Sequence, residues 1–377
     1  MPSPKLSRRE LLKASGAFLG AASLGYLTHK WRGSQNKSEK DFYFFSPYTT
    51  EKTNLEFASK EVFITLQSIR SGNNFHFKVP IRGHATLKHP VKSRSYVMLP
   101  KRGDKAIEIT LDPDMKNLSV KESLCHHTRN YYGHGAFLPH QKILLNSEVF
   151  NGSAKGALSV RDFNSYQELS QIDSGGMFPH DVSLLPDSNE ILVVNGGFPG
   201  TEFASLNRID LSNNKIVDSE KAQAIDSTFA HIERSRDSSE IFIACTPHQK
   251  TLAGQVFYKN GSAAMIALPV SEKISANLHG QALSLSLDEK HHTLGATYPD
   301  SNCILFWNYK NRELLRVLAS PRPTGLCLSP DGGYFVSANR HGHLAKIDSK
   351  TLDFVDNPNV KEASGSYISH ASILELS

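Results

Sequence analysis

The sequence predicts an all-β fold, a seven-bladed β-propeller, on three observations. After residue 41 no long helical pattern occurs, and short apolar runs alternate with turn signals. These runs recur in units of 45–51 residues, with four runs to a unit. The last unit breaks off after one run, and three runs stand before the first full unit. A ring of blades closed by strands from both ends of the repeat accounts for all three observations.

Each full unit begins with a strand that ends just before a turn. These six strands are Ala85–Lys88, Ala136–Leu138, Val182–Leu185, Ile232–Ser235, Ala282–Leu287 and Gly325–Leu328. A strongly apolar second strand follows each turn, for example Glu190–Gly197, and a third follows that, for example Ser205–Leu211. A weaker, polar strand usually comes fourth, such as Leu118–Leu124. Four strands joined by tight turns make up a propeller blade, here of the WD40/YVTN-like kind.

The residue just before the first strand sets the register of the units. This position is occupied by His84, His134, His180, His231, His279, Thr324 and His370, at intervals of 50, 46, 51, 48, 45 and 46 residues. After His370 only Ala371–Ser377 remain, which is enough for one strand. Three further strands are predicted at Phe42–Ser46, Glu61–Ile69 and Phe75–Val79. Pairing the single C-terminal strand with these three N-terminal strands completes a seventh blade and leaves no open sheet edge. The sequence therefore predicts a single monomeric propeller over residues 42–377.

The N-terminal segment has the features of an export signal. Ser7-Arg8-Arg9-Glu10-Leu11-Leu12-Lys13 precedes a mildly apolar run from Ala14 to Leu27. It is similar at every position to the twin-arginine (Tat) consensus S-R-R-x-[FL]-L-K; an ordinary basic amphipathic N-terminus is the alternative. Residues 1–29 are therefore predicted to be a Tat signal recognised by the Tat translocase, and residues 30–41 a flexible spacer. Because no clean A-x-A follows Leu27, retention of the signal as an inner-membrane anchor stays open beside cleavage.

Charge and cysteine content narrow the function classes. The net charge of +5 comes from the first 40 residues, which hold eight basic and two acidic residues; the remainder holds 34 basic and 35 acidic residues. The body of the protein therefore has no electrostatic footprint for nucleic acid. Four scattered cysteines form no CxxC or CxxCH motif and are predicted to be small buried hydrophobes. A Cys303–Cys327 bridge between neighbouring repeats is the alternative for two of them.

Several short motifs place the sequence beside a known family. They are Arg82-Gly83-His84, Tyr132-Gly133-His134-Gly135, the strand Leu144–Glu148, Phe178-Pro179-His180-Asp181, the run Ile191–Gly197, and Leu305-Phe306-Trp307. In these motifs the sequence resembles the bacterial Tat-exported seven-bladed propellers of unknown function that are encoded beside imelysin-type iron-uptake components. The resemblance covers most of 80–345 and is most specific between 130 and 200. It departs at Val149–Gly156, which is shorter than the glycine-rich acidic loop usual there. The resemblance implies a role in periplasmic iron handling, alongside other iron-uptake proteins.

The repeated histidines are the strongest chemical signal. Six of the seven units carry histidine at the entrance to the innermost strand, and such positions converge around one mouth of the central channel. The predicted metal ligands are His84, His134, His180, His231, His279 and His370. Imidazole suits first-row transition metals, and iron or copper is predicted. A seven-fold ring is too wide for six histidines to bind one ion, so two or three neighbours would do so. Arg82, Glu148 and Arg322 are expected near the same rim, where they would suit an anion or a metal chelate.

A structural role for the histidines is the alternative. In WD40-type blades, a Gly-His at this entrance bonds a polar group within its own blade. Asp162 and Asp210 close the third strands of two units and are candidate partners, although Gly-His itself occurs only at Gly83-His84 and Gly133-His134.

Three function classes follow. The leading hypothesis is a non-enzymatic periplasmic binding or scaffold protein in metal uptake. The second is an enzyme that uses the channel mouth, either a lactonase or a metal-dependent oxidoreductase. No catalytic motif such as G-x-S-x-G, H-E-x-x-H or a Walker loop is present. The third is a protein-interaction platform with structural histidines.

Export is tested by changing the paired arginines. Replacing Arg8 and Arg9 by lysine should block the Tat route, because the translocase reads the arginine pair itself, and the protein should accumulate in the cytoplasm. Cell fractionation measures this, with Lys5→Ala, outside the motif, as the control. Unchanged periplasmic recovery of the double variant would contradict the Tat assignment.

Overall fold

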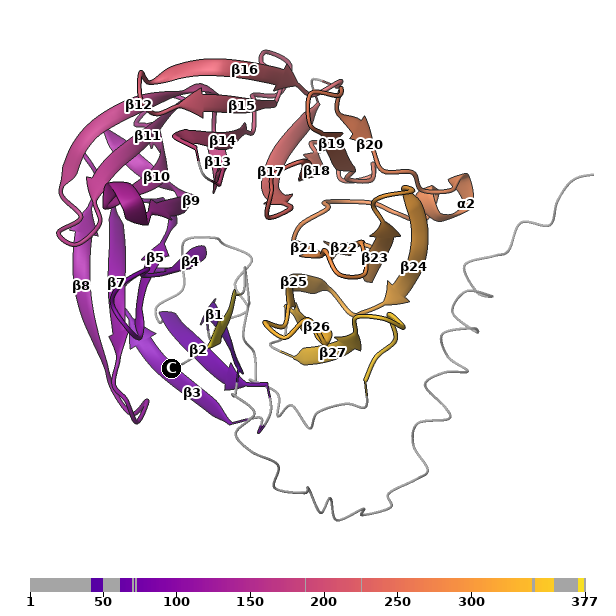
Figure 1. The fold of residues 1–377 in the computed structure, drawn as a ribbon, viewed down its shortest axis with the longest axis horizontal. Coiled ribbons are helices and arrows are strands. Elements are labelled where there is room, and N and C mark those ends of the chain that lie inside the picture. The colour runs from indigo at the N-terminus through magenta and orange to yellow at the C-terminus, as the bar shows by residue number, and fades with distance from the viewer. Residues whose placement is uncertain are drawn as a thin grey trace, which may run out of the picture. The chain divides into compact units, whose positions relative to one another are not determined.

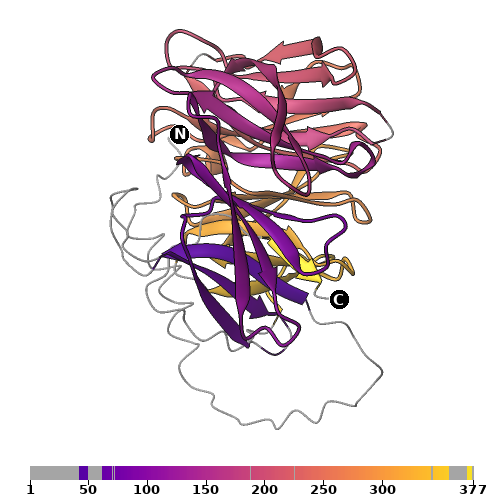
Figure 2. The same cartoon turned by 90° about the vertical axis from the view of Figure 1, so that its left-hand side faces the viewer.

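The computed structural model describes residues 42–49, 62–69, 71, 73–186, 188–224, 226–340, 343–355 and 372–375. Their regular structure is almost entirely β, and the strands form seven separate sheets. Figure 1 shows these sheets arranged as blades around a central axis, and Figure 2 shows the ring from the side. The predicted all-β, seven-bladed propeller is confirmed. The predicted signal segment and spacer of residues 1–41 lie outside the described residues.

Blades 1 to 3 follow one another along the chain. Blade 1 comprises β4 (Ala85–Lys88), β5 (Ser95–Leu99), β7 (Lys105–Leu111) and β8 (Leu118–Leu124). Blade 2 comprises β9 (Arg129–Leu138), β10 (Ile143–Phe150), β11 (Lys155–Asp162) and β12 (Glu168–Met177), with β6 (Lys101–Gly103) added beside β9. Blade 3 comprises β13 (Pro179–Leu184), β14 (Glu190–Asn195), β15 (Ser205–Asp210) and β16 (Lys215–Lys221).

Blades 4 to 7 complete the ring. Blade 4 comprises β17 (Ser227–Arg234), β18 (Glu240–Pro247), β19 (Val256–Asn260) and β20 (Ile266–Ala267). Blade 5 comprises β21 (Leu285–Asp288), β22 (Thr293–Tyr298), β23 (Cys303–Asn308) and β24 (Glu313–Ala319). The described part of blade 6 comprises β25 (Pro323–Leu328), β26 (Tyr334–Asn339) and β27 (Leu344–Asp348). Blade 7 comprises β28 (Ser372–Glu375), β1 (Phe42–Thr49), β2 (Val62–Ser68) and β3 (Asn74–Val79).

Burial falls from the middle of each blade to its outer strand. All five residues of β5 and five of the six in β14 are buried, because both faces of these strands pack against neighbouring blades. The outer strands β8 and β16 are mostly exposed, which explains their polar sequences. The apolar clusters also cross between blades. Trp307 of blade 5, for example, packs in one cluster with Phe242 of blade 4, and its indole N–H donates to the carbonyl of Pro269 at 2.9 Å.

Ring closure follows the predicted arrangement. The C-terminal strand β28 pairs antiparallel with β1, from Phe42 opposite Glu375 to Phe45 opposite Ser372. The sheet order β28-β1-β2-β3 puts one C-terminal strand beside three N-terminal strands. The closure predicted from the truncated last unit is therefore confirmed.

Helical structure among the described residues is confined to two short elements. These are the 3-10 helix η1 (Pro139–Gln141) and the single-turn helix α2 (Glu272–Ser275). No helix in the described ranges is long and apolar enough to span a membrane. All four cysteines are free thiols, three of them buried and Cys327 partly exposed, so the Cys303–Cys327 bridge is not formed.

The closing strand gives a test of the architecture. Replacing residues 372–377 by a Gly-Ser segment of equal length keeps the chain length but weakens the strand that pairs with β1. We expect a lower midpoint of thermal unfolding and a broader, less cooperative transition, measured by calorimetry. The exposed substitution Val91→Ser is the control and should leave the midpoint unchanged. A Gly-Ser variant as stable as the parent would contradict the role of β28 in closure.

Candidate functional site

Four of the predicted histidines meet at the ring's inner face. They belong to blades 1 to 4, and we call the set of His84, His134, His180 and His231 the histidine hub. Each pair of rings among the four has its centroids 4.9–6.4 Å apart. His180 and His231 are only 5% and 7% exposed. Four imidazoles from four separate blades therefore form one compact, largely buried group.

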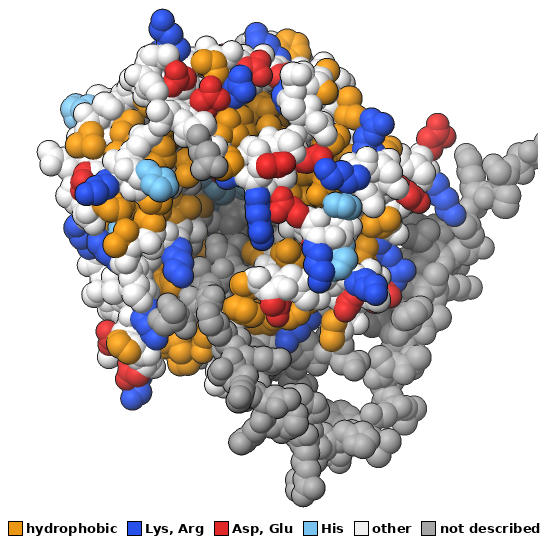
Figure 3. Space-filling model, in the orientation of Figure 1, with side chains coloured by type: hydrophobic (Ala, Val, Ile, Leu, Met, Phe, Trp, Pro, Cys, Tyr) orange, Lys and Arg blue, Asp and Glu red, His pale blue; other side chains and the backbone are white. Residues whose placement is uncertain are grey.

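The inner strands bring these histidines together. β4, β9, β13 and β17 lie nearest the centre of the ring in Figure 1, and His84 directly precedes β4 while the other three lie within their strands. In the space-filling view of the same orientation, histidine, lysine and arginine side chains stand among the groups around the centre of the ring (Figure 3). Because blades repeat by rotation about the axis, groups near the starts of the inner strands gather at one end of the channel.

Irregular pairing in the inner strands orients the hub. In blade 3, His180 is the extra residue between the pairs Pro179–Asn195 and Asp181–Val194. Such a bulge bends the strand and re-aims a side chain. In blade 2 the register also shifts, and the Ser147 hydroxyl bonds both backbone groups of His134. It accepts the N–H at 3.3 Å and donates to the carbonyl at 3.0 Å.

The register of the blades differs slightly from the one predicted. The extra residue that corresponds to His180 is Thr324 in blade 6, as expected, but in blade 4 it is Ala230. His231 stands one residue later, at the position that Asp181 occupies in blade 3. The prediction of one equivalent position for all the histidines is therefore wrong for His231. It is also wrong for His134, because Gly135 after it pairs with Asn146 as Val182 pairs with Val193 in blade 3. Both histidines join the hub from the neighbouring position.

Gly133 makes room for the hub. It adopts a φ of 113°, which L-residues with a side chain rarely adopt. A Cβ at this position would lie 2.6 Å from Cδ2 of His84. The approach of His84 to blade 2 therefore depends on a residue without a side chain here.

Asp181 is the anionic partner of the hub. Its carboxylate lies 3.4 Å from Nδ1 of His134 and 3.8 Å from Nδ1 of His231. It also accepts the backbone N–H groups of Val182 at 2.8 Å and Ile232 at 3.2 Å. The repeat pattern did not single out this residue, although it stands in the motif Phe178-Pro179-His180-Asp181. A polar residue directly after a hub histidine was the available signal.

The electrostatics at His134 favour neutral imidazole beside the ionised carboxylate of Asp181. Burial lowers the pKa of His134 to about 4, although the nearby Asp181 charge acts in the opposite direction. Burial alone would raise the pKa of Asp181, but His134, His231 and the Ile232 N–H together hold it below its ordinary value. A second carboxyl, the partly buried Glu233, stands two residues after His231 on β17, and burial raises its pKa to about 7.

Two overlapping sets of side chains could hold a metal ion. His84, His134 and His180 offer ligand atoms that all lie within 4.8 Å of one another, and so do His134, Asp181 and His231. Nitrogens bound to one ion at about 2.0–2.1 Å lie at most about 4 Å apart, so small side-chain rotations bring the first set to bonding distance. With that set as ligands, Asp181 can orient His134 from behind, as carboxylates commonly do for metal-bound histidine.

The remaining predicted metal ligands do not join the hub in the described structure. His279 lies in an exposed loop, six residues before β21, because blade 5 begins its inner strand later than predicted. The Ser301 hydroxyl bonds its backbone N–H and carbonyl at 2.8 and 2.9 Å. The prediction that His279 marks the entrance to an inner strand is therefore wrong. His370 lies outside the described residues.

The three predicted rim residues have different positions. Arg82 and Arg322 precede β4 and β25, at the entrances of inner strands. Glu148 is completely buried within blade 2, where its carboxylate binds Arg129 Nε at 2.7 Å and Arg161 at 3.0 Å. The expectation that Glu148 lies at the rim is therefore wrong: it neutralises buried arginines between strands.

The proposed structural partners of the histidines have other roles. Asp162 accepts the N–H groups of Asn164 and Ser165 and stabilises the turn after β11. Asp210 likewise bonds the N–H of Ser212 and the side chain of Asn213 after β15. Neither aspartate therefore serves as the polar partner that the WD40-type interpretation requires.

His89 shows the structural kind of histidine for contrast. It is 1% exposed, its Nδ1 accepts the N–H groups of Val91 and Lys92, and its Nε2 lies 3.1 Å from the carbonyl of Phe163 in the next blade. Backbone groups thus occupy both ring nitrogens and link two blades. The hub histidines instead face one another and a shared carboxylate.

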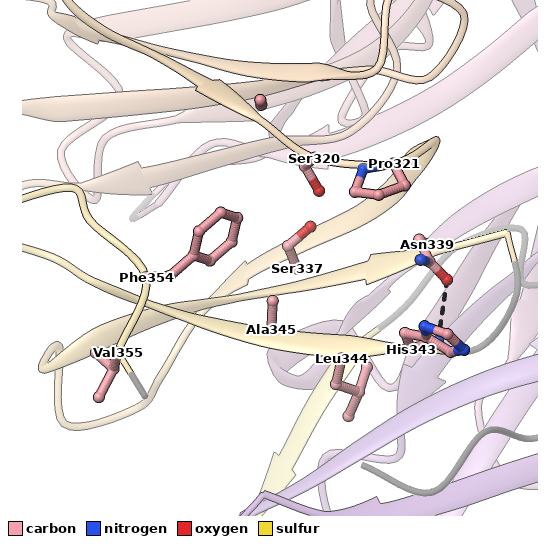
Figure 4. A pocket seen from close by; sticks show the side chains of 10 residues that line it. Ser320, Pro321, Ser337, Asn339, His343, Leu344, Ala345, Phe354 and Val355 are labelled. Atoms are coloured by element: carbon pink, nitrogen blue, oxygen red, sulfur yellow. Dashed lines mark hydrogen bonds between the residues drawn. The ribbon is translucent and has the colours of Figure 1, made fainter. Parts of the chain in front are cut away.

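A separate pocket of about 480 Å³ lies between blades 5 and 6. Figure 4 shows Phe354 and Val355 at one side of it and Asn339 and His343 at the other. The His343 N–H donates to the Asn339 side chain at 3.0 Å. None of the hub histidines lines this pocket, and its mixed apolar and polar walls indicate no particular chemistry.

Comparison with known proteins identifies a family and supports the fold. The model of a family described as protein of unknown function (DUF1513) matches residues 77–363. No curated protein matches the chain in sequence.

Solved structures share the architecture at low sequence identity. Hydrazine synthase of Kuenenia stuttgartiensis is 15% identical, with a TM-score of 0.63 over 86% of this chain and 100% of that one. The periplasmic gluconolactonase of Pseudomonas aeruginosa is 12% identical, with a TM-score of 0.64 over 89% and 100% of the two chains. A protein from Lactobacillus plantarum is 13% identical, with a TM-score of 0.65 over 89% and 100%. At identities this low, the structural similarity supports the propeller fold and gives no information on function.

Gly133 offers a test of how the hub is built. The variant Gly133→Ala should lower the free energy of unfolding by about 1–3 kcal/mol, because it combines backbone strain with a clash against His84. The control is Gly152→Ala, since Gly152 also has a positive φ but a Cβ there would meet no neighbouring atom within 4 Å. It should cost about 1 kcal/mol from backbone strain alone, which is less than the loss in Gly133→Ala. Denaturant unfolding measures both values, and equal losses would contradict the tight approach of His84.

Proposed function

We propose that this chain, which belongs to the DUF1513 family of proteins of unknown function, binds a transition-metal ion at the histidine hub. The convergence of four imidazoles and one carboxylate from four inner strands carries the proposal. Imidazole is the commonest protein ligand of transition metals, and three of these imidazoles offer ring nitrogens within 4.8 Å of one another.

The types of ligand atom narrow the choice of metal ion. His84, His134 and His180 supply nitrogen ligands, and imidazole with carboxylate suits iron, copper and zinc rather than calcium or magnesium. Iron or copper is the proposed ion. A low pKa keeps His134 deprotonated and ready to bind at neutral pH. When bound, iron or copper supplies Lewis acidity and a redox couple; this chain's residues hold the ion and orient its ligands.

The proposed cellular role is that of an exported, non-enzymatic metal-binding or scaffold protein in iron uptake. The Ser7–Lys13 motif supports export by the Tat pathway to the periplasm, either free or held at the inner membrane. The resemblance to propellers encoded beside imelysin-type components supports iron as the cargo and other periplasmic iron-uptake proteins as partners. A protein that stores or passes on a metal needs ligands and a binding surface, and no catalytic nucleophile.

A second candidate is a hub-based enzyme, either a lactonase or a metal-dependent oxidoreductase. The partly buried carboxyl of Glu233 near the hub favours it, because a carboxyl whose pKa lies near 7 can exchange protons at neutral pH. A propeller fold shared with a periplasmic gluconolactonase is compatible with this candidate. A protein-interaction platform without metal is the third candidate.

Metal analysis of natively purified protein tests the proposal. We expect weak, reversible binding of iron or copper near one ion per chain, and at least a tenfold loss of affinity in His134→Ala, because one ligand is removed. His279→Ala, an exposed histidine outside the hub, is the matched control and should bind as the parent does.

The other outcomes separate the three candidates. Tightly held, stoichiometric, redox-active metal together with turnover of a lactone or a redox substrate would support the enzyme. Absence of metal from the parent, with no binding on titration, would contradict the proposal and leave the interaction platform. Equal affinities of the parent and His134→Ala would place the metal elsewhere.

A further inference from the structure

One strand breaks the four-strand pattern of the blades. β6 belongs to the connection between β5 and β7 of blade 1, yet it pairs with β9 of blade 2, on the side away from β10. Because β9 is the innermost strand of blade 2, β6 extends that sheet toward the channel. Residues 101–105 were predicted only as the connection between two strands, since three residues are too few to show a strand pattern.

The pairing brings a basic side chain to the hub. Lys101 lies opposite Tyr132, and its ammonium is 5.9 Å from the centroid of the Tyr132 ring. The Tyr132 ring lies in turn 6.0 Å from the ring of His180. His134 follows Tyr132 by two residues on β9. Lys101 is itself exposed.

An aromatic wall stands beside this lysine. Tyr132 stacks on Phe178 with a centroid distance of 5.3 Å, and Phe178 stacks on Phe198 at 6.0 Å. Phe198 is 41% exposed and ends the stack at the surface. The neighbourhood of the hub on this side therefore combines aromatic rings with one positive charge, which suits a small organic anion better than a hydrated inorganic one.

We propose that Lys101 and the hub metal together bind a small organic carboxylate, which enters as a ligand of the metal. The inference rests on the proposed metal-binding function and names the co-ligand that the same site takes. Three histidines leave coordination positions of an iron or copper ion open. A divalent ion beside the single charge of Asp181 keeps net positive charge, and Lys101 adds to it. A carboxylate bridging the ion and the ammonium balances this charge through a charge-assisted hydrogen bond.

The test uses the full exported domain loaded with Cu²⁺ and titrated with oxalate. The visible absorption band of the bound copper reports binding, because a new oxygen ligand shifts it. In Lys101→Met the oxalate affinity should fall by roughly tenfold or more, since one charge-assisted contact is lost. Arg102→Met is the matched control: Arg102 is the exposed basic neighbour on β6 and should change the affinity by less than about twofold. Lys101→Arg should restore most of the affinity, because the charge is kept.

Each other result has a definite meaning. A parent chain that takes up no Cu²⁺ overturns the metal assignment and, with it, the carboxylate site. A chain that binds Cu²⁺ but whose Lys101→Met and Arg102→Met variants bind oxalate equally well overturns the carboxylate site alone. Tighter binding of inorganic phosphate than of oxalate, in the same titration, overturns the organic carboxylate as the ligand class. Equal thermal midpoints of the variants and the parent show that these comparisons concern binding and not folding.

Discussion

The pairing of β28 with β1 is the constraint on which the rest of the structure depends. A propeller blade stays in place because both its faces pack against neighbours, and the last gap in this ring is filled by a sheet that joins the two ends of the chain. Closure fixes the angle of every blade about the axis. The inner strands β4, β9, β13 and β17 can therefore bring together side chains that are far apart in sequence. The imidazole of His231, for example, has its centroid 4.9 Å from those of His134 and His180.

The hub is held by a balance between burial and charge. Burial disfavours protonated imidazole, which lowers the pKa of His134, while the ionised Asp181 is stabilised by the same histidine, by His231 and by a backbone N–H group. Neutral nitrogen donors beside one carboxylate are the protonation states that metal coordination needs. Burying these polar groups costs free energy. The apolar clusters that run between the blades offset this cost.

Much of the fold could be predicted from the sequence, because strand period and turn chemistry are local properties. The inner strand of blade 1 was predicted to the residue, and the closure followed from counting strands. The site could be predicted only in part. His84, His134 and His180 were expected together, but the inclusion of His231 through an offset of one residue depends on a bulge at Ala230, which alternation alone does not reveal. His279 was misplaced because blade 5 inserts the helix α2 and a loop before its inner strand. Glu148 was misplaced because its buried partners, Arg129 and Arg161, come from other strands.

The asymmetry of the ring explains why a site forms at all. A fully regular ring would place equivalent histidines on a wide circle, too far apart to share one ion. Here the ligands come from four consecutive blades, so the group lies on one side of the axis, and bulges turn its members toward one another. The departures from the repeat lie at the same place: Gly133 clears space for His84, and β6 adds Lys101 beside Tyr132. Bulges, close-approach glycines and extra strands each weaken regular pairing. Their concentration around the hub is the pattern expected where a fold gives up local regularity to position a binding site.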